Sequence, residues 1–194
     1  VPVPDSGVPA ALGYAEKSKK NFELGLIRNH YVGRTFIEPT QNIRSLGVKL
    51  KLNSSKTIVK NKSIILIDDS LVRGTTCHKI VKMLYESGAR EVHVRIACPE
   101  IKYPDFYGVD MPTEEELLAN NKNNQEMCDY IKAKSLKFLS LDGLYTALIN
   151  EKRQTNYPQF SDHYFTGNYP IEPQDNLRGV KIKQLSLLSG KSSS

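Results

Sequence analysis

The sequence lacks tryptophan, has only three cysteines among 194 residues, and contains no apolar run near the ~20 residues that a membrane-spanning helix needs. Cys77, Cys98 and Cys128 are odd in number and have no CxxC spacing, which argues against a disulfide scaffold and a structural zinc site. We therefore expect a reducing, cytoplasmic environment and no membrane partner. With 39% hydrophobic and 25% charged residues, the composition is that of an ordinary globular domain.

The charge balance is mildly basic, with 27 Lys and Arg against 21 Asp and Glu and a formal net charge of +6. A small polyanionic ligand and weak attraction to nucleic acid would both suit this excess. Aromatic residues make up 8%, and no RNP-like or zinc-finger pattern occurs. We therefore do not expect nucleic acid as a partner.

Residues 62–98 predict a strand, a loop, a helix and a second strand. Residues 63–67 form an apolar run that is typical of a strand buried on both faces of a parallel sheet. The helix is expected to begin with the hydroxyl of Thr75 or Thr76 as its N-cap and to end just before Gly88. The unit is a βαβ motif.

Other segments fit the same sheet. Residues 1–4 would end a strand, 10–19 form a helix, 92–96 alternate as a strand, 136–141 form a short strand, and 143–150 form a helical turn. The fold class is therefore α/β, with a mostly parallel, open sheet flanked by helices.

Two features concern boundaries. Thr113 and Glu116 have the spacing of a capping box. Beyond Pro173 the chain becomes rich in Ser and Lys without periodicity, so we expect one domain over 1–172 and a flexible tail over 173–194.

The loop at 68–76 carries the clearest chemistry. It follows a buried strand at its carboxyl end, where open α/β sheets place their ligands. Its glycine, its hydroxyls and the following helix N-terminus suit a phosphate, to which Arg73 adds a charged fork. A ribose diol, a divalent cation, or both would satisfy Asp68 and Asp69. A phosphorylated sugar meets all these demands; an acidic cap followed by a plain turn is the alternative.

Residues 65–76 (Ile-Leu-Ile-Asp-Asp-Ser-Leu-Val-Arg-Gly-Thr-Thr) resemble the phosphoribosyl pyrophosphate (PRPP) motif of type I phosphoribosyltransferases. Further segments resemble the amidophosphoribosyltransferase family, which forms 5-phosphoribosylamine and pyrophosphate from PRPP and ammonia in the first committed step of purine synthesis. These segments are 4–7, 25–29, 31–37, 106–113 and 165–170. The resemblance implies a type I phosphoribosyltransferase-like fold with a mobile lid loop.

The resemblance also implies roles for single residues. Asp68 and Asp69 would bind the ribose hydroxyls and, together with Ser6, Mg²⁺. Asp5, Ser6 and Gly7 would form the pyrophosphate loop. The 5′-phosphate would be held by Ser70, Arg73, Gly74, Thr75 and Thr76.

The implied lid is the segment 31–52, in which Arg34 would contact the pyrophosphate. Arg34, Asp68 and Asp69 would thus assist the displacement at C1, and the sequence nominates no general base. The family further implies purine nucleotides as feedback ligands and a homo-oligomer.

The chain departs from the family in two ways. No cysteine precedes Cys77, so we expect the family's N-terminal glutaminase domain, with its nucleophilic cysteine, to be missing and the domain to be truncated at its N-terminus. Asp105, Ser161 and Tyr164 stand where some relatives have cysteines that hold an iron–sulfur cluster, and we expect no such cluster here.

Three alternatives remain. The chain could be a fragment that binds PRPP or nucleotides without turnover, or another type I phosphoribosyltransferase. Binding of nucleic acid through the net charge ranks last. His78 and His163 are expected to be ordinary, isolated histidines.

Overall fold

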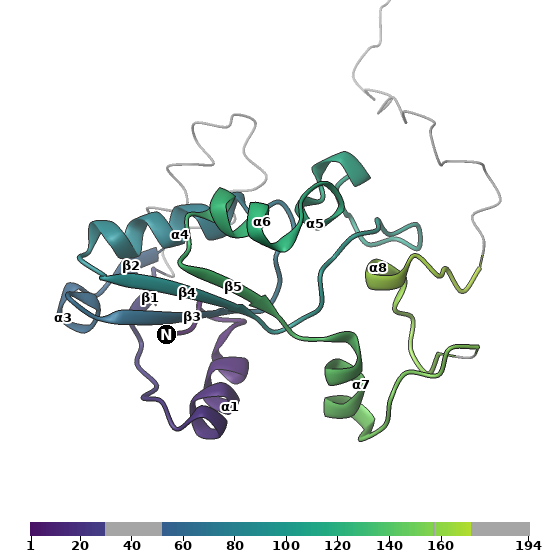
Figure 1. Ribbon diagram of the computed structural model, residues 1–194, viewed down its shortest axis with the longest axis horizontal. Helices are drawn as coiled ribbons and strands as arrows, with labels where there is room; N and C mark the ends of the chain where they lie inside the picture. The colour runs from purple at the N-terminus through teal and green to yellow at the C-terminus, as the bar shows by residue number, and fades with distance from the viewer. Residues whose placement is uncertain (30–51, 157, 172–194) are drawn as a thin grey trace, which may run out of the picture.

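The computed structural model describes residues 1–29, 52–156 and 158–171 (Figure 1). Arg34, nearly all of the expected lid at 31–52 and the expected tail at 173–194 lie outside these residues.

Three parallel strands form the central sheet in the order β3 (Ser63–Asp68), β4 (Glu91–Ile96) and β5 (Ser135–Phe138). Residues 1–3 lie along the side of β3 opposite to β4. There the Ile67 N–H donates to the Val1 carbonyl at 2.9 Å, and the Val3 N–H donates to the Ile67 carbonyl at 2.8 Å. This pairing is also parallel. The predicted open, parallel sheet is confirmed.

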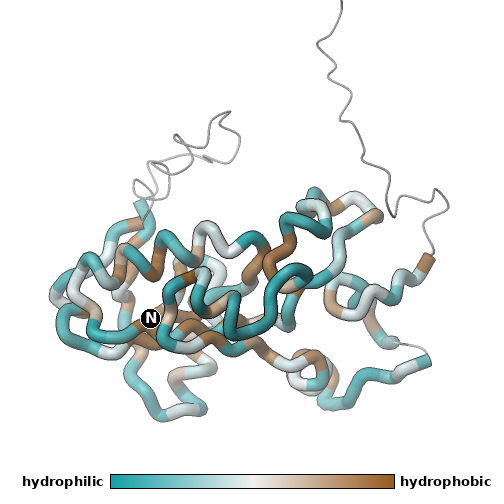
Figure 2. The backbone as a smooth tube through the Cα atoms, turned by 45° about the horizontal axis from the view of Figure 1, so that its top comes forward, coloured by the Kyte–Doolittle hydropathy of each residue, from teal (hydrophilic) through white to brown (hydrophobic). Residues whose placement is uncertain are grey.

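Helices cover both faces of this sheet. Figure 1 shows α4 (Thr75–Glu86) and α6 (Asn124–Ile131) on one side and α1 (Val8–Ser18) on the other. The hydrophobic stretches of the chain follow the strands between these helices (Figure 2). The apolar stripe of α4 is buried in the core of the predicted βαβ unit. The residues of this stripe are Cys77, Ile80, Val81 and Leu84.

The remaining elements are short. A two-stranded antiparallel sheet pairs β1 with β2, and the other elements surround the central sheet. Their bounds are β1 Leu26–Arg28, β2 Leu52–Ser54, α3 Lys56–Val59, the 3₁₀ helix η2 Glu114–Glu116, α5 Leu118–Asn121, α7 Leu141–Ile149 and α8 His163–Thr166.

The predicted cap of α4 is wrong, and the predicted capping box of Thr113 and Glu116 forms only in part. The N-cap of α4 is Gly74, whose φ of +73° favours glycine, and no side chain caps this helix. Thr113 is the N-cap of η2 and its backbone N–H donates to the Glu116 carboxylate, but the Thr113 side chain makes no capping hydrogen bond. A capping box does form at α6, where the Asn123 side chain accepts from the Glu126 N–H and the Glu126 carboxylate accepts from the Asn123 N–H.

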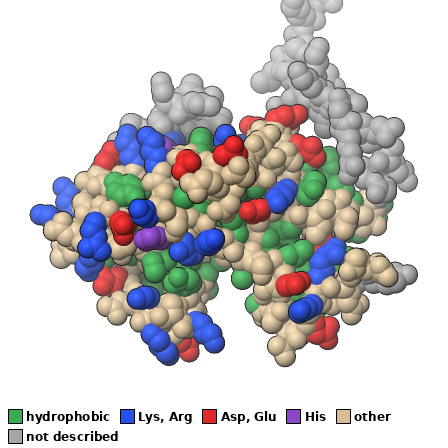
Figure 3. Space-filling view, in the orientation of Figure 1, with side chains coloured by type: hydrophobic (Ala, Val, Ile, Leu, Met, Phe, Trp, Pro, Cys, Tyr) green, Lys and Arg blue, Asp and Glu red, His purple; other side chains and the backbone are tan. Residues whose placement is uncertain are grey.

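Within the described ranges, no helix is both long and apolar enough to cross a membrane. On the face drawn in Figure 3, basic and acidic side chains are interspersed. Such mixing disfavours a continuous basic surface there of the kind that tracks a nucleic-acid backbone.

Gly7 offers a test of the contact between its loop and β3. A Cβ on Gly7 would stand 2.6 Å from the Ile67 carbonyl oxygen, a backbone atom that cannot swing away. We predict that Gly7→Ala lowers the free energy of unfolding by about 1–3 kcal/mol. Gly13 in α1 is the matched control, because nothing lies within 4 Å of its Cβ position. Gly13→Ala should raise stability by about 0.5–1 kcal/mol. Urea denaturation measures both; equal effects would contradict the close approach.

Candidate functional site

Two loops that are far apart in the sequence leave the sheet at the same end, where its parallel strands have their carboxyl ends. The loop with Asp5 and Gly7 follows the segment 1–3, and the loop 68–76 follows β3. Because these segments run parallel and are paired, both loops emerge at their carboxyl ends. The contact of Gly7 with the Ile67 carbonyl fixes how close the two loops come. The structure therefore brings the two predicted halves of the site together.

The acidic pair combines a buried and an exposed carboxylate. Asp68 is only 9% exposed, whereas Asp69 is exposed. The Asp69 N–H donates to Asp68 Oδ1 at 3.0 Å, and Ser70 Oγ donates to Asp69 Oδ1 at 2.9 Å. Burial, followed by the charge of Asp69, raises the pKa of Asp68 to about 7. A cation or a hydroxyl donor at this pair would relieve that electrostatic conflict.

The loop ends in a surface suited to an anion. Gly74 is buried, whereas Thr75 and Thr76 in the first turn of α4 are exposed. The His78 N–H makes the helix's first hydrogen bond, to the Gly74 carbonyl at 2.9 Å, so the three preceding N–H groups have no partner within the helix. Free N–H groups and exposed hydroxyls at a helix N-terminus are the donors that a phosphate requires.

Arg73 has a partner that the sequence did not suggest. Its Nη2 donates to Glu116 Oε2 at 3.0 Å, and its Nε donates to Oε1 at 3.3 Å. The hydrogen bond from Arg73 holds the pKa of Glu116 below its usual value. The only sequence signal at Glu116 was its spacing from Thr113, which pointed to a helix cap instead.

Arg28 is a second residue that the sequence left without a specific role. It closes β1 and forms an ion pair with Asp5 of the expected pyrophosphate loop. The ion pair therefore ties this loop to the two-stranded sheet.

The oxygen donors of Asp68, Asp69 and Ser6 fit magnesium better than a soft metal. Two carboxylates and the Ser6 hydroxyl are oxygen donors, and Mg²⁺ completes such sets with water and substrate phosphates. Burial, with a smaller contribution from the acidic pair, raises the pKa values of Cys77 and Cys98 to about 12, so both thiols stay protonated. In the part of the chain that the structure describes, no group of three or more His, Cys, Asp or Glu side chains is arranged to hold a metal.

His163 lies at the centre of a polar cluster, so the prediction of an isolated histidine is wrong. Its Nε2 lies 2.9 Å from Asp105 Oδ1, and its Nδ1 lies 2.9 Å from Ser161 Oγ. The Asp105 carboxylate also accepts from the backbone N–H groups of Tyr107 and Val109. Although burial opposes it, this set of hydrogen bonds lowers the pKa of Asp105.

The same cluster bears on the iron–sulfur expectation. Asp105 and Ser161 are hydrogen-bonded to His163. The ring of Tyr164 lies against that of His163, and its hydroxyl donates to Asp105. Carboxylate, hydroxyl and phenol oxygens do not fit a cluster that needs thiolate ligands.

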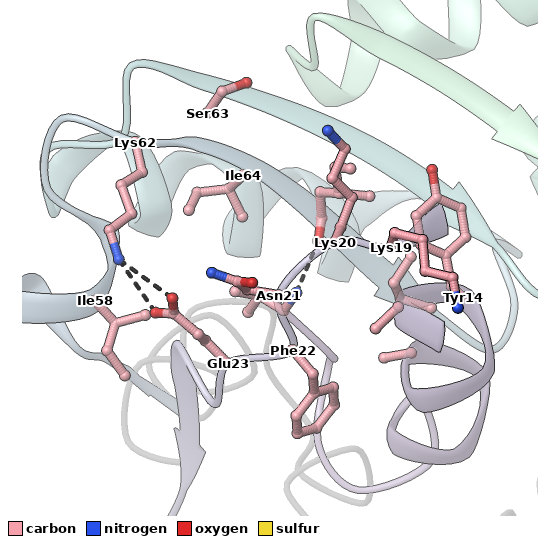
Figure 4. A pocket seen from close by; sticks show the side chains of 15 residues that line it. Tyr14, Lys19, Lys20, Asn21, Phe22, Glu23, Ile58, Lys62, Ser63 and Ile64 are labelled. Carbon is pink, nitrogen blue, oxygen red and sulfur yellow. Dashed lines mark hydrogen bonds and ion pairs between the residues drawn. The ribbon is translucent and has the colours of Figure 1, made fainter. Parts of the chain in front are cut away.

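The cavity drawn in Figure 4 is separate from this edge. It measures about 370 Å³ and is lined by residues of α1, by residues 19–23 and by residues of β3, among them Ile64 and Ile65. An ion pair of 3.2 Å between Lys62 and Glu23 lies at one end. Neither Asp68 nor Asp69 lines it, so it is not part of the candidate site.

The raised pKa of Asp68 predicts a pH dependence of stability. The value rises from 3.8 to about 7 on folding, so the folded chain binds this proton more tightly and loses stability as the pH rises from 4 to 7. Asp68→Asn should remove that loss and stabilise the chain above pH 7 by up to about 4 kcal/mol. Chemical denaturation at pH 5 and pH 8 measures this. Asp110→Asn is the control, because it removes a carboxylate from an exposed position. An unchanged pH slope in Asp68→Asn would refute the prediction.

The chain is similar in sequence to curated proteins. The chain is 56% identical to the amidophosphoribosyltransferase of Rhizobium etli over 190 residues, covering 97% of this chain and 38% of that protein. It is 51% identical to the chloroplastic amidophosphoribosyltransferase of Glycine max, covering 96% of this chain and 31% of that protein. The chain thus spans about a third of the length of these curated relatives.

Solved structures agree. The glutamine PRPP amidotransferase of B. subtilis, complexed with ADP and GMP, matches with a TM-score of 0.78 and 47% identity, covering 90% of this chain and 38% of that one. A structure described as the allosteric regulatory enzyme of purine biosynthesis matches with a TM-score of 0.77 and 47% identity, covering 90% and 37%. No protein-family model matches the sequence. Over the stretch that it spans, the chain belongs to the amidophosphoribosyltransferase family, in its type I phosphoribosyltransferase part.

Proposed function

We propose that this chain binds PRPP at the carboxyl edge of its sheet and transfers the phosphoribosyl group to ammonia. The products are 5-phosphoribosylamine and pyrophosphate, as in the first step of purine synthesis. The observation that carries the proposal is the meeting of the loop at Asp5–Gly7 with the acidic pair and the anion-binding turn of 68–76. Their chemistry matches the pyrophosphate, the ribose diol and the 5′-phosphate of one ligand.

Each part of the ligand has its own set of residues in this proposal. Asp68 and Asp69 accept hydrogen bonds from the ribose hydroxyls, because carboxylates are acceptors that favour a diol. The backbone of the loop and the Thr75 and Thr76 hydroxyls donate to the 5′-phosphate. Asp5, Ser6 and Gly7 face the pyrophosphate, with Arg34 as a further contact from outside the described residues.

The reaction asks little covalent chemistry of the protein. The nitrogen lone pair of ammonia forms a bond to C1 while the C1–O bond breaks. The electron pair of the broken C1–O bond leaves with pyrophosphate. The surplus proton on nitrogen passes to water. The contribution of the chain is to hold C1 and the leaving group in line and to stabilise the developing charge.

Ser6, Asp68 and Asp69 are the residues that would hold Mg²⁺. When bound, the ion would offset the negative charge that builds up on the pyrophosphate. The raised pKa of Asp68 supports this assignment, since two neighbouring carboxylates without a cation favour protonation of one of them.

Purine nucleotides are the feedback ligands that we infer. The B. subtilis relative was solved with ADP and GMP. A nucleoside monophosphate offers a ribose diol and a 5′-phosphate, so it fits the same residues as PRPP and would compete with it.

Release of pyrophosphate tests the transfer. With PRPP and Mg²⁺, we expect release when ammonium is supplied and only background when it is withheld. Asp69→Asn should reduce the rate about 100-fold, because an exposed group that contacts the substrate is lost without disturbing the core. Asp110→Asn controls for the loss of one surface charge.

The other outcomes distinguish the alternatives. PRPP binding without release, in a folded chain, would support a binding fragment. Release that needs a free purine or pyrimidine base in place of ammonium would identify another phosphoribosyltransferase. Failure to bind PRPP at all would refute the proposal.

We also propose that the chain contains no iron–sulfur cluster. Protein purified without oxygen should have iron and acid-labile sulfide at the level of the buffer blank, because the polar cluster around His163 offers no thiolates. Stoichiometric iron that leaves on exposure to air would contradict this.

A further inference from the structure

Residues 113–118 contact three successive residues of the loop 68–76, here called the phosphate loop. These residues are Val72, Arg73 and Gly74. The Leu118 N–H donates to the Val72 carbonyl at 2.9 Å. Glu116 receives both hydrogen bonds of Arg73. The Leu118 side chain packs so closely on Gly74 that a Cβ there would stand 2.7 Å from Leu118 Cδ2. The loop and this segment therefore form one unit, although more than 40 residues separate Arg73 from Glu116.

The turn that carries Glu116 is itself held in place. Asn121 Nδ2 donates to the carbonyls of Glu114, Glu115 and Leu117 at 2.9–3.1 Å. These hydrogen bonds hold the turn that carries Glu116, which limits the conformations that the ion pair with Arg73 can adopt.

The geometry of the ion pair determines which donors of Arg73 remain. Glu116 takes the Nε proton and one Nη2 proton, and a guanidinium carries five N–H donors in a planar fork. Among the described residues, Arg73 Nη1 makes no hydrogen bond that would compete for it. An arginine fixed along one edge by a carboxylate still offers its other donors to an anion, and in a single orientation.

We propose that Glu116 is a positioning residue for PRPP: it orients the Arg73 guanidinium and holds the phosphate loop in its binding conformation. This inference rests on the proposed function. The pair contributes through orientation more than through stability, because each side chain is 51% exposed and exposed ion pairs add little to folding.

The experiment compares Glu116→Gln with Glu114→Gln. Both remove one negative charge from the same turn, but no hydrogen bond or ion pair of the Glu114 side chain occurs within the described ranges. We expect Glu116→Gln to raise the KM for PRPP about 3- to 10-fold, with kcat within about twofold of the parent and an unchanged Tm. Glu114→Gln should leave KM, kcat and Tm as they are.

A double-mutant cycle tests whether Glu116 acts through Arg73. In an Arg73→Ala background, Glu116→Gln should cause no further rise in KM. A further rise of the same size would overturn the inference, as would a lower KM in the single Glu116→Gln variant, which would mean that Glu116 competes with the phosphate for Arg73.

Binding of ribose 5-phosphate, measured by calorimetry, distinguishes this inference from the proposed function. Equal affinity in the parent and Glu116→Gln overturns the role of Glu116 and leaves the proposed function intact. No binding by the folded parent overturns both, because the loop is then not a phosphate site. Weaker binding in Glu116→Gln alone supports both.

Discussion

The parallel pairing of residues 1–3 with β3 is the interaction on which the candidate site depends. Two backbone hydrogen bonds on Ile67 align the segments, and they place the loop after Val3 next to the loop after Asp68. Neither loop alone would bind a ligand with a phosphate at each end. Gly7 makes the alignment tight, since any side chain there would meet the Ile67 carbonyl. Backbone geometry at the sheet edge thus determines the span of the site, and side chains then provide its chemistry.

Asp68 shows how the site departs from what folding alone would favour. A buried carboxyl beside a second carboxylate is destabilising at neutral pH, and its pKa of about 7 expresses that conflict. Among the described residues, no cationic side chain is a cause of this shift: the charge that acts on Asp68 is the like charge of Asp69, and the thiols of Cys77 and Cys98 stay neutral. A buried group left in this state is typical of a place where a ligand completes the interactions.

Much of the fold could be predicted from the sequence, because the βαβ unit has long apolar signals. The run at 63–67 and the stripe of α4 each depend on local periodicity. The stripe is buried, as are Ile64, Leu66 and Ile67 of the run, whereas Ile65 is half-buried and Ser63 is exposed. The predicted cap of α4 failed for a reason that is equally local: at Gly74 a positive φ replaces a side-chain cap. The residues of the loop at 68–76 could be nominated, but Glu116 could not, since its partner is 43 residues away.

The polar cluster at His163 joins two distant segments of the chain by hydrogen bonds. A thiolate cluster and a set of hydrogen bonds can both join two distant segments, here 105–109 and 161–164. Hydrogen bonds do so only when the buried groups all find partners, and Asp105 meets this condition by accepting from His163, Tyr164 and two backbone N–H groups. Around His163, the side chains of Asp105, Ser161 and Tyr164 all take part in such hydrogen bonds, so the two segments are joined without any thiolate.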